Sequence, residues 1–213
     1  MTLKAIEDRI GSLSKPSKMP CHGYSIPATA CERGSLLRQI KGSVCEDCYA
    51  LKNRYVFPNV QQGLNKRLNA VLNDPLWEEL ITELISRKER SGYFRWHDSG
   101  DILSVEHLDT LNRIALSLPA IRFWLPTRET GFISEWLGNG SKPADNLQIR
   151  LSANMVGQQP INPRYIRDTK IKTSTVGFVG ALFNCPASKQ GNSCQSCRAC
   201  WSASVNSVNY TQH

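Results

Sequence analysis

The chain has 213 residues, of which 40% are apolar, and a formal net charge of +8. This length supports one sizeable core, so the chain needs no covalent staples for stability. It has no run of eighteen apolar residues, and residues 1–15 mix charged with apolar residues where a signal peptide needs an unbroken apolar stretch. We therefore expect a cytoplasmic protein without a membrane partner.

Eight cysteines are unusual for such a protein. The cytoplasm keeps thiols reduced, so metal binding or catalysis is favoured over disulfides. The basic charge suggests attraction to polyanions, but it counts every thiol as neutral. Two 4Fe-4S centres with four thiolates each would each carry a charge of about −2 and offset part of it. Nucleic acid is therefore a weakly supported partner.

The amino-terminal half predicts two helices. Residues 1–20 are polar, contain Pro16 and Pro20, and are interpreted as an arm or a loosely docked strap. Apolar residues recur at helical spacing over 60–72, after Pro58. A second helix follows Asp74 and Pro75 and ends before residues 91–92.

A strand-helix repeat follows. Strands are predicted to begin at Tyr93, Ile121, Leu147 and Thr175, which gives spacings of 28, 26 and 28 residues. Helices are predicted after the cap Ser104 and over 132–137. The fold class is therefore α/β, a partial (β/α) barrel or a small open parallel sheet with cysteine-rich terminal segments. We expect a single domain over 1–213, with a cysteine-containing segment 1–58, a βα array 59–180 and a cysteine-rich tail 181–213.

Polar residues follow each predicted strand, at the sheet edge where such folds place their chemistry. The candidate catalytic residues are His97, Asp98, Asp101 and Arg128. A histidine beside two carboxylates can act as a general acid or base, although the same residues are typical of a strand-to-helix turn. Arg128 can bind an anionic ligand or pair with one of the aspartates.

The carboxyl-terminal cysteines are Cys185, Cys194, Cys197 and Cys200. Three cysteines at two-residue spacing suit a 4Fe-4S cluster better than a mononuclear zinc site, which usually takes one pair from each of two segments. A structural zinc ribbon remains the alternative.

The amino-terminal cysteines are Cys21, Cys31, Cys45 and Cys48. Cys21 is the weakest ligand candidate, and His22 can replace it. The fragment 45–50 is similar to the second half of the radical S-adenosylmethionine signature, but position 41, where the first cysteine belongs, is Lys41. S-Adenosylmethionine is thus a possible cofactor without its full motif.

Several long motifs resemble the bacteriophage gene product 88 domain family: GSVCEDCYALKNRYVFPNVQ, FRWHDSGDILSVEHL, FWLPTRE, LQIRLSANM and CPASKQGNSCQSCRACW. The resemblance runs from about Met19 to the carboxyl terminus. It implies a phage-encoded protein of the host cytoplasm that binds iron-sulfur or another metal, with an architecture related to radical S-adenosylmethionine partial barrels. By position, every cysteine except Cys21 matches the family's cysteine motifs, and the four candidate catalytic residues match its polar ones.

Two functions follow as hypotheses. The first is an iron-sulfur protein with one or two 4Fe-4S clusters and a redox or radical role on an unknown small-molecule substrate or redox partner. The second is a non-enzymatic phage protein with structural zinc or iron-sulfur sites that binds a host factor or nucleic acid. The sequence leaves open whether the protein is an enzyme and which cysteines share a centre.

Overall fold

A computed structural model describes residues 1–212. Its six strands form one sheet in which neighbours are parallel and follow chain order. The strands are β1 (His22–Tyr24), β2 (Tyr93–Trp96), β3 (Arg122–Thr127), β4 (Leu147–Ser152), β5 (Lys172–Val176) and β6 (Ser207–Tyr210). The α/β class with an open, all-parallel sheet is confirmed.

Six α-helices lie in the described chain: α1 (Leu3–Ile10), α2 (Glu32–Leu37), α3 (Pro58–Asn73), α4 (Trp77–Lys88), α5 (Val105–Ser117) and α6 (Thr130–Gly138). Their ends follow the sequence signals. Pro58 occupies the first turn of α3, and Ser104 caps α5 by accepting from the backbone N of His107.

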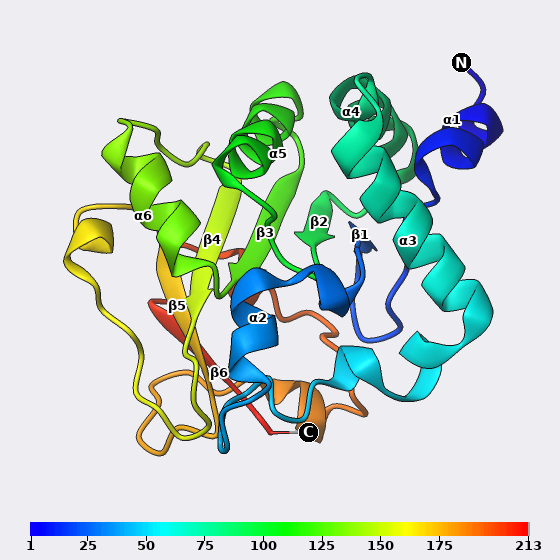
Figure 1. The fold of residues 1–213 in the computed structure, drawn as a ribbon. Helices are drawn as coiled ribbons and strands as arrows, with labels where there is room; N and C mark the ends of the chain where they lie inside the picture. Colours follow the sequence, from blue (N-terminus) through cyan, green and yellow to red (C-terminus); the bar gives the residue numbers. More distant parts are fainter. Residues whose placement is uncertain (213) are drawn as a thin grey trace.

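The main core lies between the sheet and helices α1, α4, α5 and α6. In Figure 1, α4, α5 and α6 lie in front of the strands. Alternation along β3 sends Phe123 and Leu125 into this core, whereas Trp124 faces the opposite side of the sheet, which we call the inner face. Every residue of β4 is buried, because both faces of the sheet are covered.

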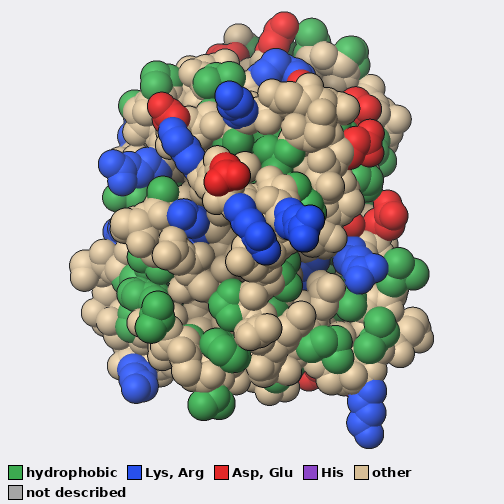
Figure 2. Space-filling model, turned by 90° about the vertical axis from the view of Figure 1, so that its left-hand side faces the viewer, with side chains coloured by type: hydrophobic (Ala, Val, Ile, Leu, Met, Phe, Trp, Pro, Cys, Tyr) green, Lys and Arg blue, Asp and Glu red, His purple; other side chains and the backbone are tan. Residues whose placement is uncertain are grey.

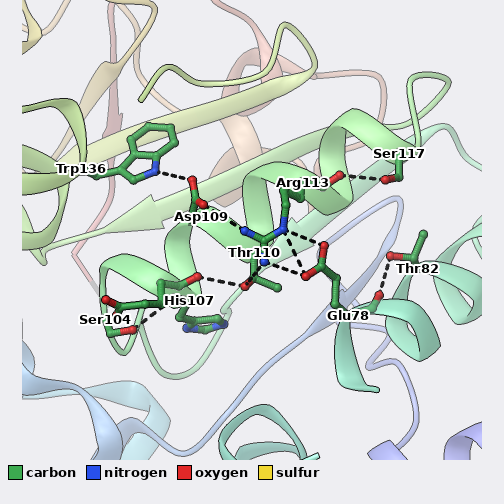
Figure 3. A network of polar contacts seen from close by, with 10 residues as sticks. Glu78, Thr82, Ser104, His107, Asp109, Thr110, Arg113, Ser117 and Trp136 are labelled. Carbon is green, nitrogen blue, oxygen red and sulfur yellow. Dashed lines mark hydrogen bonds and ion pairs between the residues drawn. The ribbon is translucent and has the colours of Figure 1, made fainter. Parts of the chain in front are cut away.

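Polar contacts join the three central helices to each other (Figure 3). Arg113 of α5 pairs with Glu78 of α4 and with Asp109, one turn earlier in α5. Asp109 in turn accepts a hydrogen bond from Trp136 Nε1 of α6 over 3.0 Å. These contacts fix the spacing of α4, α5 and α6 on the outside of the sheet.

Residues 177–206 cover the inner face. This connection between β5 and β6 contains two short 3₁₀ turns, Pro186–Lys189 and Ala199–Trp201. The second turn packs on β3 and β4, and Trp201 Nε1 donates to the carbonyl of Phe94 in β2 over 2.8 Å. A crossover of this length without an α-helix is uncommon in a compact domain.

The interpretation of residues 1–20 as a loosely docked arm is wrong in part. Leu3–Ile10 is a helix, and Ile6 and Ile10 are fully buried against α4 and α3. Tyr24 Oη also donates to the carbonyl of Ile10 over 2.5 Å. The high density of charges among residues 4–9 obscured an apolar pair four residues apart.

Two strands were missed, and one begins earlier than predicted. Strand β5 begins at Lys172 rather than Thr175 and ends before Gly177, whose φ of 66° is incompatible with a strand. Strands β1 and β6 are three and four residues long, and they contain fewer large apolar residues than β2, which is as short as β6.

Among the helices of residues 1–212, none is long and apolar enough to span a bilayer.

Candidate functional site

Three cysteines gather beyond the carboxyl end of β1. Cys31 is the N-cap of α2, and Cys45 and Cys48 follow in the turns after that helix. Burial raises the pKa of the Cys31 thiol, and Asp101, Cys48, Glu129 and Cys45 raise it further. Burial also raises the pKa of Cys45, whose charged neighbours are Arg128 and Arg38 as well as Cys48 and Asp101. We call Cys31, Cys45 and Cys48 the edge thiols.

Gly34 of α2 leaves the space between two of these thiols open. A Cβ built on Gly34 would lie 3.6 Å from Cys31 Sγ, 3.9 Å from Cys45 Sγ and 2.9 Å from Cys31 Cβ. The last distance is too short for an undisturbed contact. Glycine thus keeps a cradle between the two sulfur atoms that any side chain would fill.

Two carboxylates border the edge thiols. Burial raises the pKa of Asp101, although the backbone N of Arg128 donates to its Oδ2 over 2.9 Å and that of Ile102 to its Oδ1 over 2.8 Å. Burial, followed by the proximity of Asp101, raises the pKa of Glu129 to about 7. A bound cation would relieve this crowding of acidic groups, because it favours their charged forms.

Asp98 is anchored by hydroxyl groups from three segments. Ser25 Oγ and Tyr55 Oη donate to its carboxylate, the latter over 2.8 Å, and Tyr49 Oη donates to its carbonyl oxygen. Tyr49 also interacts with Arg95 of β2. Asp98 therefore ties the loop after Cys48 to the carboxyl end of β2.

The His97 ring points away from the edge thiols. It has a φ of 54° and packs against Trp96 and against His107 of α5, with ring centroids 6.1 and 5.6 Å apart. Burial lowers its pKa well below the usual value. No hydrogen-bond partner reaches either ring nitrogen within residues 1–212.

Unpaired polar atoms collect at the carboxyl ends of β2, β3 and β4. Arg128 Nε, Ser99 Oγ and Asn154 Oδ1 are buried and have no hydrogen-bond partner in the described part of the chain. The backbone of Asn154 accepts from Val44 N over 2.8 Å, next to Cys45. Buried polar groups are normally paired, so these atoms are available to a bound molecule or to water.

A groove of about 560 Å³ opens beside this edge. It runs between the start of α6 and residues 154–165, and Thr130 and Asn154 line it on the side of the edge thiols. Its other walls are mostly uncharged: Gln158, Gln159, Pro160, Ile161, Asn162, Pro163 and Tyr165.

The four carboxyl-terminal cysteines, which we call the tail thiols, line one small cavity on the inner face: Cys185, Cys194, Cys197 and Cys200. Burial raises the pKa of Cys200 to about 12, and Cys200 Sγ lies 3.2 Å from Tyr210 Oη. The rest of the wall is carbon, largely from Phe183, Trp201 and Val208. Among the residues that line this cavity, only the cysteines have a side-chain atom that can ligate a metal.

Cys21 belongs with the tail thiols rather than with the edge thiols. Cys21 precedes β1 and Cys31 follows it, so the two thiols lie beyond opposite ends of this strand. Cys21 is 2% exposed and packs with Trp124, Cys200 and Trp201. Cys194 is one of its electrostatic neighbours. The amino-terminal group of four is therefore three thiols plus one from another site.

No three His, Cys, Asp or Glu side chains within residues 1–212 are arranged so that they could hold a metal ion as they stand. Ligands of a cubane bind different irons and lie farther apart than those of a single ion. The edge thiols and the tail thiols still fit a soft metal, because each group supplies sulfur ligands and neither consists of hard oxygen ligands alone.

Sequence reasoning missed the residues that sit inside elements. Arg95, in the middle of β2, stacks 4.5 Å above the Trp124 ring and lies between Asp98 and the tail thiols. Arg150, within β4, is fully buried. A charged residue whose neighbours in the strand are apolar, as Phe94 and Trp96 are for Arg95 and Ile149 and Leu151 for Arg150, is the signal that points to both.

The gene product 88 family model matches residues 2–203. The chain belongs to this family, as its motifs had suggested. No curated protein and no solved structure matches the chain.

Proposed function

We propose that this member of the gene product 88 family is an iron-sulfur protein whose reactive 4Fe-4S cluster binds to Cys31, Cys45 and Cys48. The observation that carries the proposal is the proximity of these three thiols, two of them beside Gly34, at the carboxyl edge of a sheet whose strands follow chain order. This is the edge at which βα folds hold their substrates.

Three thiolates leave one iron of a cubane without a cysteine ligand. When bound, such a cluster supplies single electrons at low potential to a molecule held beside it. The chain contributes binding and orientation: Arg128 offers an unpaired Nε, Asn154 an unpaired Oδ1, and the groove beside them offers room for an organic substrate.

S-Adenosylmethionine is the cofactor that we propose for the open position. The signature lacks its first cysteine at Lys41, and Cys31 supplies a third thiol from the cap of α2 instead. The sequential parallel sheet and the position of the thiols between β1 and α3 both support this assignment.

A second candidate function is a non-enzymatic one, in which metal sites are structural and a basic surface binds nucleic acid. Its support is the connection 162–172, where Arg164 and Arg167 are exposed, while the neighbouring Lys170 pairs with Asp145. Lys and Arg side chains gather in the middle of one face of the molecule (Figure 2). Binding of this kind weakens steeply as salt is raised.

The test is anaerobic purification followed by iron and sulfide analysis and paramagnetic resonance of the reduced protein. We expect brown protein with broad absorption at about 400 nm. The paramagnetic resonance signal of the reduced protein should change when S-adenosylmethionine is added. The triple variant C31A/C45A/C48A should lose that signal.

A matched glycine pair tests the site without removing a ligand. Gly34→Ala fills the cradle between Cys31 and Cys45 and should lower the cluster content, whereas Gly138→Ala in α6 meets nothing within 4 Å and should not. Colourless wild-type protein, or a signal unchanged in the triple variant, would refute the proposed function.

A further inference from the structure

A cavity that the edge thiols do not line indicates a second metal centre. Four thiols from one segment line it, and its remaining wall is apolar and aromatic, with no carboxylate or imidazole. Soft thiolate donors in apolar surroundings select iron-sulfur clusters or zinc and do not suit hard cations. Cys185, Cys194, Cys197 and Cys200 together supply the four ligands that a complete cubane takes.

A buried positive charge without a carboxylate partner lies beside this cavity. Arg150 is fully buried in β4 on the inner face, and its five hydrogen bonds go to the carbonyl oxygens of Thr173, Ala199, Cys200, Ser202 and Val205, over 2.7–3.1 Å. No carboxylate within residues 1–212 pairs with it. A buried cation requires a compensating negative charge, and a cluster with four thiolates carries one.

Arg95 and Arg198 extend the same pattern. Arg95 contributes positive charge at Cys21, Cys194 and Cys200, and Arg198 at Cys21 and Cys194. Both signs of charge occur around the edge thiols, because Asp101 and Glu129 lie near Cys31 and Arg128 and Arg38 lie near Cys45. The positive charge beside the tail thiols suits a cluster that four thiolates make anionic.

The backbone of the tail is tightly turned around Cys194. Cys197 N donates to the carbonyl of Cys194 over 2.8 Å, so the two cysteines enclose a tight turn. Gln195 within it has a φ of 43°, and Asn192 before it a φ of 58°. Non-glycine residues in this region cost energy, which the surrounding structure or a ligand must supply.

We propose that Cys185, Cys194, Cys197 and Cys200 bind a second 4Fe-4S cluster, ligated entirely by thiolates and held on the inner face of the sheet between Arg150 and Arg95. The cavity encloses about 10 Å³, room for one water molecule, so residues 185–197 move outward when the cluster is inserted, while Arg150 holds the backbone of residues 199–205 in place. Between Cys185 and Cys197 the only regular structure is the 3₁₀ turn Pro186–Lys189, and such movement breaks few backbone hydrogen bonds.

Cys21 is assigned no iron by this proposal. It is a buried thiol beside Cys194, and Glu89 rather than an arginine is its strongest electrostatic neighbour. It provides the matched control, since it is a cysteine of the same neighbourhood that lies outside the cavity wall.

The experiment counts iron and sulfide in four anaerobically reconstituted proteins: wild type, C197A, C21A and the triple variant C31A/C45A/C48A. We expect about eight irons per chain in the wild type and in C21A, and about four in each of the others. Iron in C197A equal to that of the wild type, an equal loss in C21A, or one zinc per chain in place of a cluster would overturn the second centre.

The triple variant separates the two proposals. If the edge cluster does not exist and the tail cluster does, the wild type and the triple variant hold the same four or so irons. If C197A does not fold, the wild type labelled with iron-57 decides the question by Mössbauer spectroscopy. About one iron in eight, the one without a cysteine ligand, should change its ligation when S-adenosylmethionine or cyanide is added, whereas a second such iron per chain would contradict a closed centre.

Discussion

Arg150 and Cys200 are joined across the inner face of the sheet: Arg150 Nε donates to the carbonyl oxygen of Cys200 over 3.0 Å. Four further donations from the same guanidinium go to neighbouring carbonyls. One side chain thus fixes the end of the tail to β4 and β5. The contact is made with the backbone, so it depends on the shape of the tail rather than on its side chains.

Replacing Arg150 should therefore destabilise the protein strongly. Arg150→Met leaves several buried carbonyl oxygens without donors, at a cost of roughly 3–5 kcal/mol, whereas Arg150→Lys restores only part of the five bonds. Urea unfolding measures the loss. Arg122→Met, at an exposed position on β3, is the control and should change the free energy of unfolding by less than about 0.5 kcal/mol. Equal unfolding midpoints for the two methionine variants would contradict the role of Arg150.

The turn after β2 should tolerate no side chain at Gly100. Its φ is 84°, and a Cβ would lie 2.3 Å from Ile26 Cγ1 and 2.8 Å from the Ile26 carbonyl oxygen. Gly140 has the same φ and nothing within 4 Å of a Cβ. Gly100→Ala should thus cost about 1–3 kcal/mol more than Gly140→Ala, the excess being steric. Thermal or urea unfolding of both variants tests this, and similar losses would show that the backbone conformation alone matters.

Acidification should destabilise the fold through His107. Burial lowers the pKa of His107 to about 4, and its Nδ1 accepts a hydrogen bond from Leu103 N over 3.1 Å. The unfolded chain, with a pKa near 6.5, binds a proton first. The free energy of unfolding should therefore fall as the pH drops from about 7 to about 4, by on the order of 3 kcal/mol from this residue.

The variant His107→Asn is the control for that prediction. Asparagine can accept the same hydrogen bond but does not titrate, so the pH dependence of its unfolding should be flatter. Some slope remains, because burial also lowers the pKa of His97, whose ring faces His107. Parallel pH profiles for the wild type and His107→Asn would exclude His107 as the source.

Helix α1 should behave as part of the core. Ile10→Ala removes a fully buried side chain and should cost about 2–5 kcal/mol, measured by urea unfolding. Lys4→Ala, on the exposed side of the same helix, loses only a surface pair with Asp8 and should change stability by less than about 1 kcal/mol. Equal effects would restore the interpretation of this segment as a loose arm.

The sequence predicted the central part of the fold because strands β2, β3 and β4 and the helices after them carry clear patterns. It could not divide the cysteines correctly. Cys21 and Cys31 are ten positions apart, and the strand between them, β1, carries the chain from the amino ends of the strands to their carboxyl ends. Spacing along a chain gives no warning of this when the strand has three residues.

Arg95 and Arg150 were missed for a related reason. Both stand within strands whose neighbours are apolar, and strand patterns alone do not distinguish a buried arginine from one that reaches solvent. Only the packing of residues 177–206 over the inner face shows that their charges are enclosed.

The order of the strands has a consequence for biosynthesis. Because each strand pairs with the one made just before it, the sheet can assemble while the chain leaves the ribosome, and Cys31, Cys45 and Cys48 emerge early. The inner face closes last, when residues 185–201 fold back and Cys194 N meets the carbonyl of Lys18. An iron-delivery factor would therefore find one group of ligands on a nascent chain and the other only after synthesis is almost complete.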